Sequence, residues 1–160
     1  MSMEELLQTI RAFEGVLDLA PAEGSGFPEI AWGDHFFYFA PDGKIPDRGQ
    51  PYATIVTKNY PGDTLSGLDA PGRWRVNIHV GKAAFTELTG SEPARAAVAR
   101  DFSAADVIHP HPVYGALGWI AVVNPGSATT PTVVALLREA HEDARRRAAR
   151  RAAHGSGGQT

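Results

Sequence analysis

The chain has 160 residues, 43% of them hydrophobic and 21% charged, with a formal net charge of −3. This length and composition fit one soluble globular domain and exclude an intrinsically disordered chain. No apolar run approaches a membrane span and the first residues lack the pattern of a signal peptide, so we expect a cytoplasmic protein without membrane association. Cysteine is absent, which excludes disulfides, thiolate catalysis and cysteine metal sites.

The charge is distributed unevenly along the chain. The last stretch is rich in arginine, and without it the remaining sequence is strongly acidic; these arginines are Arg145, Arg146, Arg147, Arg150 and Arg151. An acidic body argues against a nucleic-acid partner, because phosphate binding needs a broad basic face.

The N-terminal segment predicts a helix and then a loop. Ser2 and Glu5 have the spacing of a capping box, and Gly15 is the expected stop. Apolar residues follow the box at helical spacing, namely Leu6, Ile10 and Phe13. Residues 21–28 are rich in glycine and proline and predict a loop.

Three strands are predicted next, at residues 29–39, 52–58 and 73–80. A turn sequence at 41–43 follows the first of these strands, and another at 60–63 follows the second. Such short connections favour antiparallel pairing, because a parallel neighbour would need a crossover helix.

The second half predicts two short helices, at 82–88 with a stop at Gly90 and at 92–100. An irregular stretch at 101–114 precedes a fourth strand at 117–124. That strand is apolar on both faces and is therefore expected to be covered, with Trp119 as a core anchor.

A last helix is expected to start at Thr130 as its N-cap. Its apolar stripe ends near His141 and consists of Val133, Val134, Leu137 and Ala140. Beyond the stripe, acidic residues four positions before Arg146 and Arg147 can pair with them. We therefore predict a single α+β domain over residues 1–147, followed by a solvated helix end and disordered tail at 148–160. The domain is expected to have two layers, an antiparallel sheet of about four or more strands and helices packed on one face.

The strand at 73–80 carries the main candidate site. Its apolar residues alternate with polar ones, so that Arg73, Arg75, Asn77 and His79 share one face. Guanidinium, amide and imidazole groups suit the binding of an anion or a planar polar ligand. The alternative is a half-exposed strand whose polar side meets water.

From this face we predict a small-molecule-binding protein with cofactor-independent acid–base chemistry of the isomerase, cyclase or lyase type. His79 would transfer a proton, Arg75 would stabilise an anion or enolate, and Tyr114 or His111 would supply a second acid. The expected ligand-binding residues are Arg73, Asn77, Trp32, His35, Thr54 and Lys58. No cofactor is expected.

Two further functions remain open at this point. His109 and His111 each precede a proline and could supply two ligands of a metal site, with His79, His35 or Asp34 as the third. Alternatively, the chain is a non-enzymatic interaction domain that uses its aromatic loops or its arginine helix. A homodimer is compatible with either.

Four segments together resemble a known family: 32–38, 52–61, 73–80 and 111–119. They are similar to an actinobacterial family of small proteins of unknown function, over residues from about 3 to 147. More distantly, the layout resembles the YjbR-like and luciferase-associated small α+β domains. The first resemblance implies a cytoplasmic actinobacterial protein, and the second implies a two-layer α/β sandwich. Neither supplies a catalytic residue.

Overall fold

The computed structural model describes the chain apart from residues 48, 93–99 and 158–160. Its centre is a six-stranded antiparallel sheet in the order β1-β2-β3-β4-β6-β5. The strands are β1 (Val16–Leu19), β2 (His35–Phe39), β3 (Ala53–Val56), β4 (Arg75–His79), β5 (His109–Pro110) and β6 (Trp119–Val123). The described α-helices are α1 (Met3–Arg11), α2 (Lys82–Thr89) and α3 (Thr130–Gly157), and short 3₁₀ helices are η1 (Glu29–Ala31) and η3 (Gly115–Leu117).

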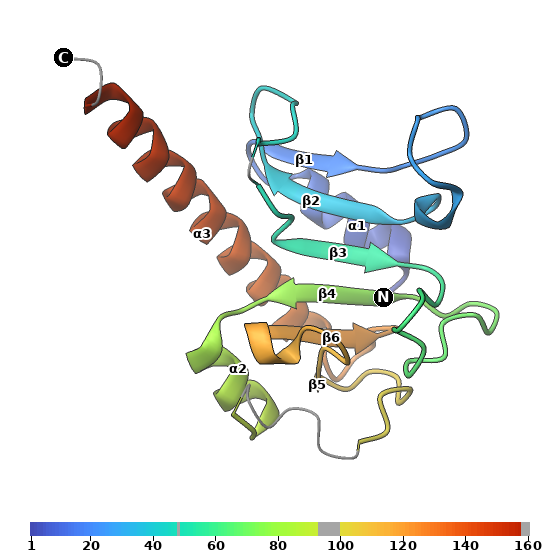
Figure 1. Cartoon of the computed structure of the whole chain (residues 1–160). Helices are drawn as coiled ribbons and strands as arrows, with labels where there is room; N and C mark the ends of the chain where they lie inside the picture. The colour runs from blue at the N-terminus through green and yellow to red at the C-terminus, as the bar shows by residue number, and fades with distance from the viewer. Residues whose placement is uncertain (48, 93–99, 158–160) are drawn as a thin grey trace.

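Helices cover one face of the sheet, where α1 and α3 lie behind the strands in Figure 1. The side chains that point to this face form the core, for example Phe37 of β2, Ile55 of β3, Val76 and Ile78 of β4, and Ile120 of β6. Alternate residues of the same strands point to the opposite face, as strand geometry requires. The α+β class and the antiparallel sheet are confirmed, with more strands than the four identified from the sequence.

The predicted capping box forms at the start of α1. The Glu5 N–H donates to the Ser2 hydroxyl at 3.1 Å, and the Ser2 N–H donates to the Glu5 carboxylate at 3.2 Å. The helix ends before Gly15, which has a φ of +76° in the turn into β1. A Cβ at Gly15 would lie 2.7 Å from the ring of Phe39, so both conformation and space require glycine there.

Several predicted boundaries are wrong. Residues 29–34 contain the helix η1, not strand, and β2 begins only at His35. The strands β1 and β5 were not predicted, because runs of four and two residues are too short for a periodic signal and depend on pairing with β2 and β6. The helix predicted at 92–100 lies almost wholly outside the described residues.

The helix α3 carries the apolar stripe that its sequence predicts, with Val133, Leu137 and Ala140 buried. Thr130 is not its cap and already lies in the helix. Asp106 instead anchors the helix start, accepting hydrogen bonds from the Gly126 and Thr129 backbone N–H groups at 2.7 and 3.0 Å.

Beyond the sheet, α3 continues as a helix to Gly157, so the predicted tail begins within it. The final residues of that tail lie outside the described part of the chain. Across the described helices, none is both long and apolar enough to cross a membrane.

Candidate functional site

A cavity of about 660 Å³ lies on the sheet face that the helices leave uncovered; we call it the larger cavity. Strand alternation places Thr54 of β3 and Arg75 and Asn77 of β4 in its lining. The loop before β4 contributes Asp63, and the segment between β5 and β6 contributes His111. Residues from separate parts of the sequence therefore meet at one polar centre.

Arg75 is the middle of this centre and is 1% exposed. Its guanidinium donates to both carboxylate oxygens of Asp63, at 2.9 and 2.6 Å. It also donates to Ser66 Oγ at 3.0 Å and to Asn77 Oδ1 at 2.7 Å, while Asn77 donates to Thr54 Oγ1 at 2.9 Å. Burial raises the pKa of Asp63, but the hydrogen bonds and charge of Arg75 outweigh it and hold that pKa below its usual value. The buried positive charge is thus neutralised within the protein.

His111 lies against this ion pair in an unusual arrangement. Its Nδ1 accepts the backbone N–H groups of Val113 and Tyr114, each at 3.0 Å. Burial and the charge of Arg75 lower the pKa of His111 to about 3, with Asp63 opposing them. The ring is therefore neutral at pH 7, and because Nδ1 is an acceptor, the single ring proton belongs on Nε2.

The Nε2–H of His111 has no protein acceptor at hydrogen-bond distance among the described residues. Its Nε2 lies 3.2 Å from Nη2 of Arg75, which is itself a donor, and 3.9 Å from Oδ2 of Asp63. Two N–H donors consequently converge in the wall of the larger cavity, an arrangement that an oxygen acceptor from a ligand would complete.

Apolar and aromatic side chains form most of the remaining lining of the larger cavity. Tyr114 packs on the His111 ring with centroids 5.0 Å apart, and Phe36, Val113 and Leu117 line the walls. Tyr114 and Leu117 are exposed. Such a mixture of apolar walls and a few fixed polar groups is typical of small-molecule sites.

Trp119 also lines this cavity, so its predicted role as a core anchor is wrong. It is only partly buried and belongs to the wall shared with a second cavity. Alternation explains the error: the neighbouring Ile120 points to the helices, whereas Trp119 points to the opposite face.

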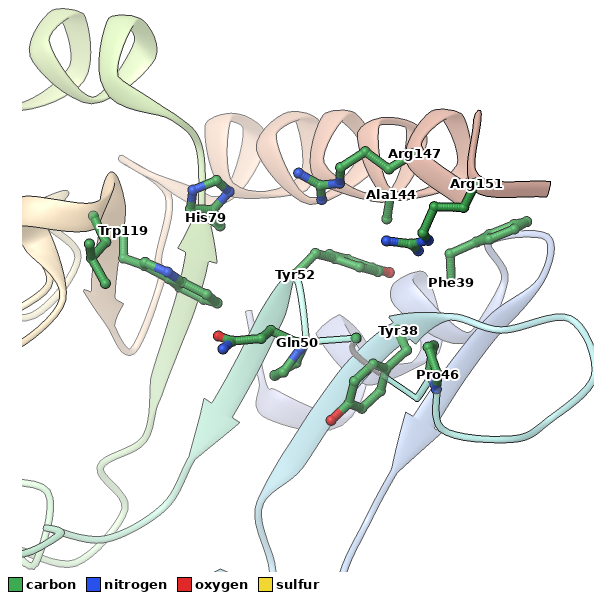
Figure 2. Close-up of a pocket in the computed structure, with 13 residues that line it drawn as sticks. Tyr38, Phe39, Pro46, Gln50, Tyr52, His79, Trp119, Ala144, Arg147 and Arg151 are labelled. Atoms are coloured by element: carbon green, nitrogen blue, oxygen red, sulfur yellow. The ribbon is translucent and has the colours of Figure 1, made fainter. Parts of the chain in front are cut away.

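The second cavity, of about 300 Å³, lies at the ends of the strands beneath the C-terminal part of α3; we call it the smaller cavity (Figure 2). His79, Arg147 and Arg151 line it. Burial and the charge of Arg147 lower the pKa of His79, against the opposing effects of a Leu117 backbone hydrogen bond and Asp143. His79 and Arg75 share a strand face, as predicted, but they line different cavities.

The remaining predicted ligand-binding residues are absent from the lining of both cavities. Arg73 donates to the carbonyl oxygens of Ser66, Gly67 and Ser103 and so fastens loops together. Trp32 donates to the Phe27 carbonyl at 3.2 Å.

His35 points to the helix-covered side of the sheet, where its Nδ1 lies 2.9 Å from Asp18 and its ring stacks on Phe37. Lys58 donates at 3.0 Å to the fully buried carboxylate of Asp34. The same carboxylate accepts the Thr57 N–H at 2.8 Å and the hydroxyls of Thr57 and Tyr60. Asp34 is therefore a closed structural centre.

The geometry does not favour a metal site at His109 and His111. The His109 Nε2 lies 2.9 Å from the Ala104 carbonyl, whereas His111 faces the cationic Arg75, which would repel a metal ion. Over the described residues, no three His, Asp or Glu side chains gather in a way that could hold a metal.

Asp63 is the main site residue that the sequence reasoning missed. The segment 60–63 was interpreted as a turn only, and a turn does form: Tyr60 and Asp63 exchange backbone hydrogen bonds at 3.2 and 2.9 Å, with Gly62 at a φ of +79°. This turn folds back over the sheet and brings Asp63 to Arg75. A buried arginine needs a counter-charge, so a buried Arg75 would have indicated that an acidic residue such as Asp63 lies beside it.

A family of unknown function, DUF6194, has a model that matches residues 1–153. No curated protein and no solved structure matches the chain. The predicted membership of an uncharacterised family is confirmed, while the actinobacterial source and the YjbR-like likeness stay predictions.

Proposed function

The chain belongs to the DUF6194 family of unknown function, and we propose that its larger cavity binds a small carbonyl compound and acts on it by acid–base chemistry. The reaction class is cofactor-independent isomerisation, cyclisation or elimination through an enolate. The observation that carries this proposal is the convergence of two N–H donors, from His111 and Arg75, in the cavity wall.

A carbonyl oxygen suits this position better than a free anion does. The charge of Arg75 is already neutralised by Asp63, so the cavity offers hydrogen bonds and little net charge. A neutral imidazole that donates through Nε2–H can polarise a carbonyl and stabilise the oxyanion that forms in the transition state. The nearby guanidinium adds to that stabilisation.

Asp63 is the proposed base. It is the carboxylate in the cavity lining, and its lowered pKa keeps it ionised at neutral pH. In the proposed step the carboxylate takes a proton from the carbon next to the carbonyl, the C–H electron pair forms a C=C bond, and the carbonyl π pair moves onto oxygen. His111 and Arg75 hold that oxygen, and the protonated Asp63 returns the proton to carbon.

The walls indicate the body of the ligand. Phe36, Tyr114 and Trp119 offer aromatic surfaces, and the volume of about 660 Å³ accommodates a flat ligand of a few rings or fewer. An aromatic or otherwise apolar carbonyl compound with an acidic C–H group fits both the walls and the polar centre.

Exchange of the α-protons of phenylpyruvate in D₂O, followed by proton NMR, tests the proposal without knowledge of the natural substrate. We expect the wild type to accelerate exchange above the buffer rate. His111→Asn should lose ~100-fold of that acceleration, because the asparagine oxygen can still accept the Val113 and Tyr114 N–H groups but offers no Nε2–H.

His109→Asn is the matched control, since its imidazole bonds to the Ala104 carbonyl outside both cavities. This variant should exchange phenylpyruvate protons like the wild type. Equal acceleration by wild type and His111→Asn would contradict the proposed role of the imidazole.

A further inference from the structure

The face of α3 that packs on the sheet changes character along the helix. Val133, Leu137 and Ala140 are buried in the core, and Ala144 packs against it. The next positions at the same spacing of three or four residues are Arg147 and Arg151. The residues on this face of α3 are therefore aliphatic over the sheet and cationic where the helix extends beyond it.

Arginines along the C-terminal half of α3 differ in whether they have an acidic partner. Arg145 pairs with Glu142 at 2.8 Å, and Arg146 pairs with Asp143 and lies 3.5 Å from Glu139. Asp143 thus pairs with Arg146 and not with Arg147, which the sequence had offered as its partner. Neither Arg147 nor Arg151 has an ion pair or hydrogen bond with any residue that the structure describes.

Arg147 and Arg151 both border the smaller cavity. Figure 2 shows their guanidinium groups extending from α3 over the strand ends, that of Arg147 toward His79. No carboxylate among the described residues lines this cavity, and its other polar side chains are neutral, among them Gln50 and Tyr38. Asp143 acts on His79 only from a distance and is itself paired with Arg146. The positive charge at this cavity is therefore uncompensated by the described residues.

We propose that the smaller cavity is an anion-binding site, in which Arg147 and Arg151 hold a phosphate or carboxylate group. Arginine presents a planar fork of donors that matches both groups. A cavity of about 300 Å³ accommodates such a group with a small part of the molecule attached. The two cavities differ in charge, because Arg75 is paired with the Asp63 carboxylate, whereas Arg147 and Arg151 have no carboxylate partner among the described residues.

The two cavities share a wall made by Gln50, Pro51, Leu117 and Trp119. Arg75 and His79 mark the two sides on β4, four residues and thus about 13 Å apart. We assign the anionic group to one end of a ligand whose carbonyl end occupies the larger cavity. This second assignment rests on the proposed function, and the anion site itself does not.

Titration with inorganic phosphate at constant ionic strength, followed by the NMR signals of His79, tests the anion site. We expect Arg147→Ala and Arg151→Ala each to raise the Kd for phosphate by about 10-fold, and the double variant to abolish saturable binding. Arg145→Ala is the matched control, because it removes one charge from the same helix but a paired one; its Kd should change by less than about 2-fold. A parallel titration with acetate distinguishes a carboxylate site from a phosphate site.

Phosphate binding that is equal in the wild type and the double variant would overturn the anion site. His111→Asn should bind phosphate like the wild type, so failure of the proposed chemistry does not affect this result.

A ligand that occupies both cavities is tested with 4-acetylphenyl phosphate, whose acetyl protons should exchange in D₂O. Compared with the wild type, the double variant should have a KM at least about 10-fold higher for this exchange and an unchanged kcat. Saturable phosphate binding and accelerated phenylpyruvate exchange, without exchange of this probe, would overturn the bridging assignment alone.

Discussion

Two buried ion-pair centres on this sheet look alike in composition and differ in completeness. Asp34 and Lys58 form one, and Arg75 and Asp63 form the other. Around Asp34, donors of Thr57, Lys58 and Tyr60 are directed at the carboxylate, and neither Asp34 nor Lys58 lines either cavity, although Tyr60 lines the larger one. Around Arg75, an additional donor from His111 has no acceptor among the described residues, and the centre borders the larger cavity.

The difference separates a structural role from a functional one. A complete network stabilises loops and needs nothing else, whereas a network with a surplus donor in a cavity wall is completed by a ligand. A buried charge alone therefore does not identify a site in this protein. The relevant feature is the unsatisfied donor beside open space.

Removal of the closed centre should have the largest effect on stability. Asp34→Ala leaves Lys58 and the Thr57 N–H without their partner, and we expect the free energy of unfolding to fall by about 3–5 kcal/mol. Urea denaturation measures the change, with the exposed Asp42→Ala as control. A loss below about 1 kcal/mol would mean that Asp34 is not the structural centre described above.

Disruption of the open centre should affect stability less and activity more. Asp63→Asn keeps an oxygen acceptor for Arg75 but removes the counter-charge, so we expect a loss of about 1.5–3 kcal/mol in unfolding free energy. The same variant should lose the acceleration of phenylpyruvate exchange, because the base is gone. Retained exchange would show that another group accepts the proton.

The neutral His111 predicts a specific pH dependence of stability. Its folded pKa of about 3 lies below the value of 6.5 for a free histidine, so only the unfolded chain binds this proton between those values. Unfolding free energy should therefore fall by up to about 1.4 kcal/mol for each pH unit below about 6. The lowered pKa of Asp63 contributes only at lower pH, near and below the usual aspartate value.

Urea denaturation of wild type and His111→Asn at pH 6 and pH 4.5 isolates this contribution. His79 has a lowered pKa as well but is present in both proteins, so its effect cancels. The variant should show the shallower pH dependence. Parallel curves for the two proteins would indicate that His111 titrates normally.

Loss of the C-terminal end of α3 should have the smallest effect on stability and on phenylpyruvate exchange. Deletion of residues 148–160 removes almost no buried core, and we expect the unfolding free energy to change by well under ~1 kcal/mol. Exchange of phenylpyruvate should also be retained. A large drop in melting temperature would show that the helix end docks on the body or on a second copy of the chain.

Local signals in the sequence predicted most of the fold. The capping box at Ser2, the alternation on β4, the αL cap at Gly90 and the apolar stripe of α3 each depend on residues close in sequence. The strands β1 and β5 depend on partners elsewhere, and no short-range pattern predicts them. Long-range pairing is where sequence reasoning failed.

The same distinction applies to the site. The alternation correctly placed Arg75 and Asn77 on one face, and the structure brings His111, Thr54 and Tyr114 to the same cavity. It could not show that the cavity ends before His79, because the wall that divides the cavities comes from segments distant in sequence. Nor could it show that Arg75 is neutralised by a turn residue.

The protonation of His111 tests the central claim most directly. Long-range ¹H–¹⁵N correlation NMR at pH 7 distinguishes the two neutral tautomers and the imidazolium. We predict a neutral ring with the proton on Nε2, which remains neutral on acidification to pH 5, because burial and Arg75 disfavour the charged form. A proton on Nδ1, or a charged ring at pH 7, would contradict the proposal that the larger cavity presents a free donor to a ligand.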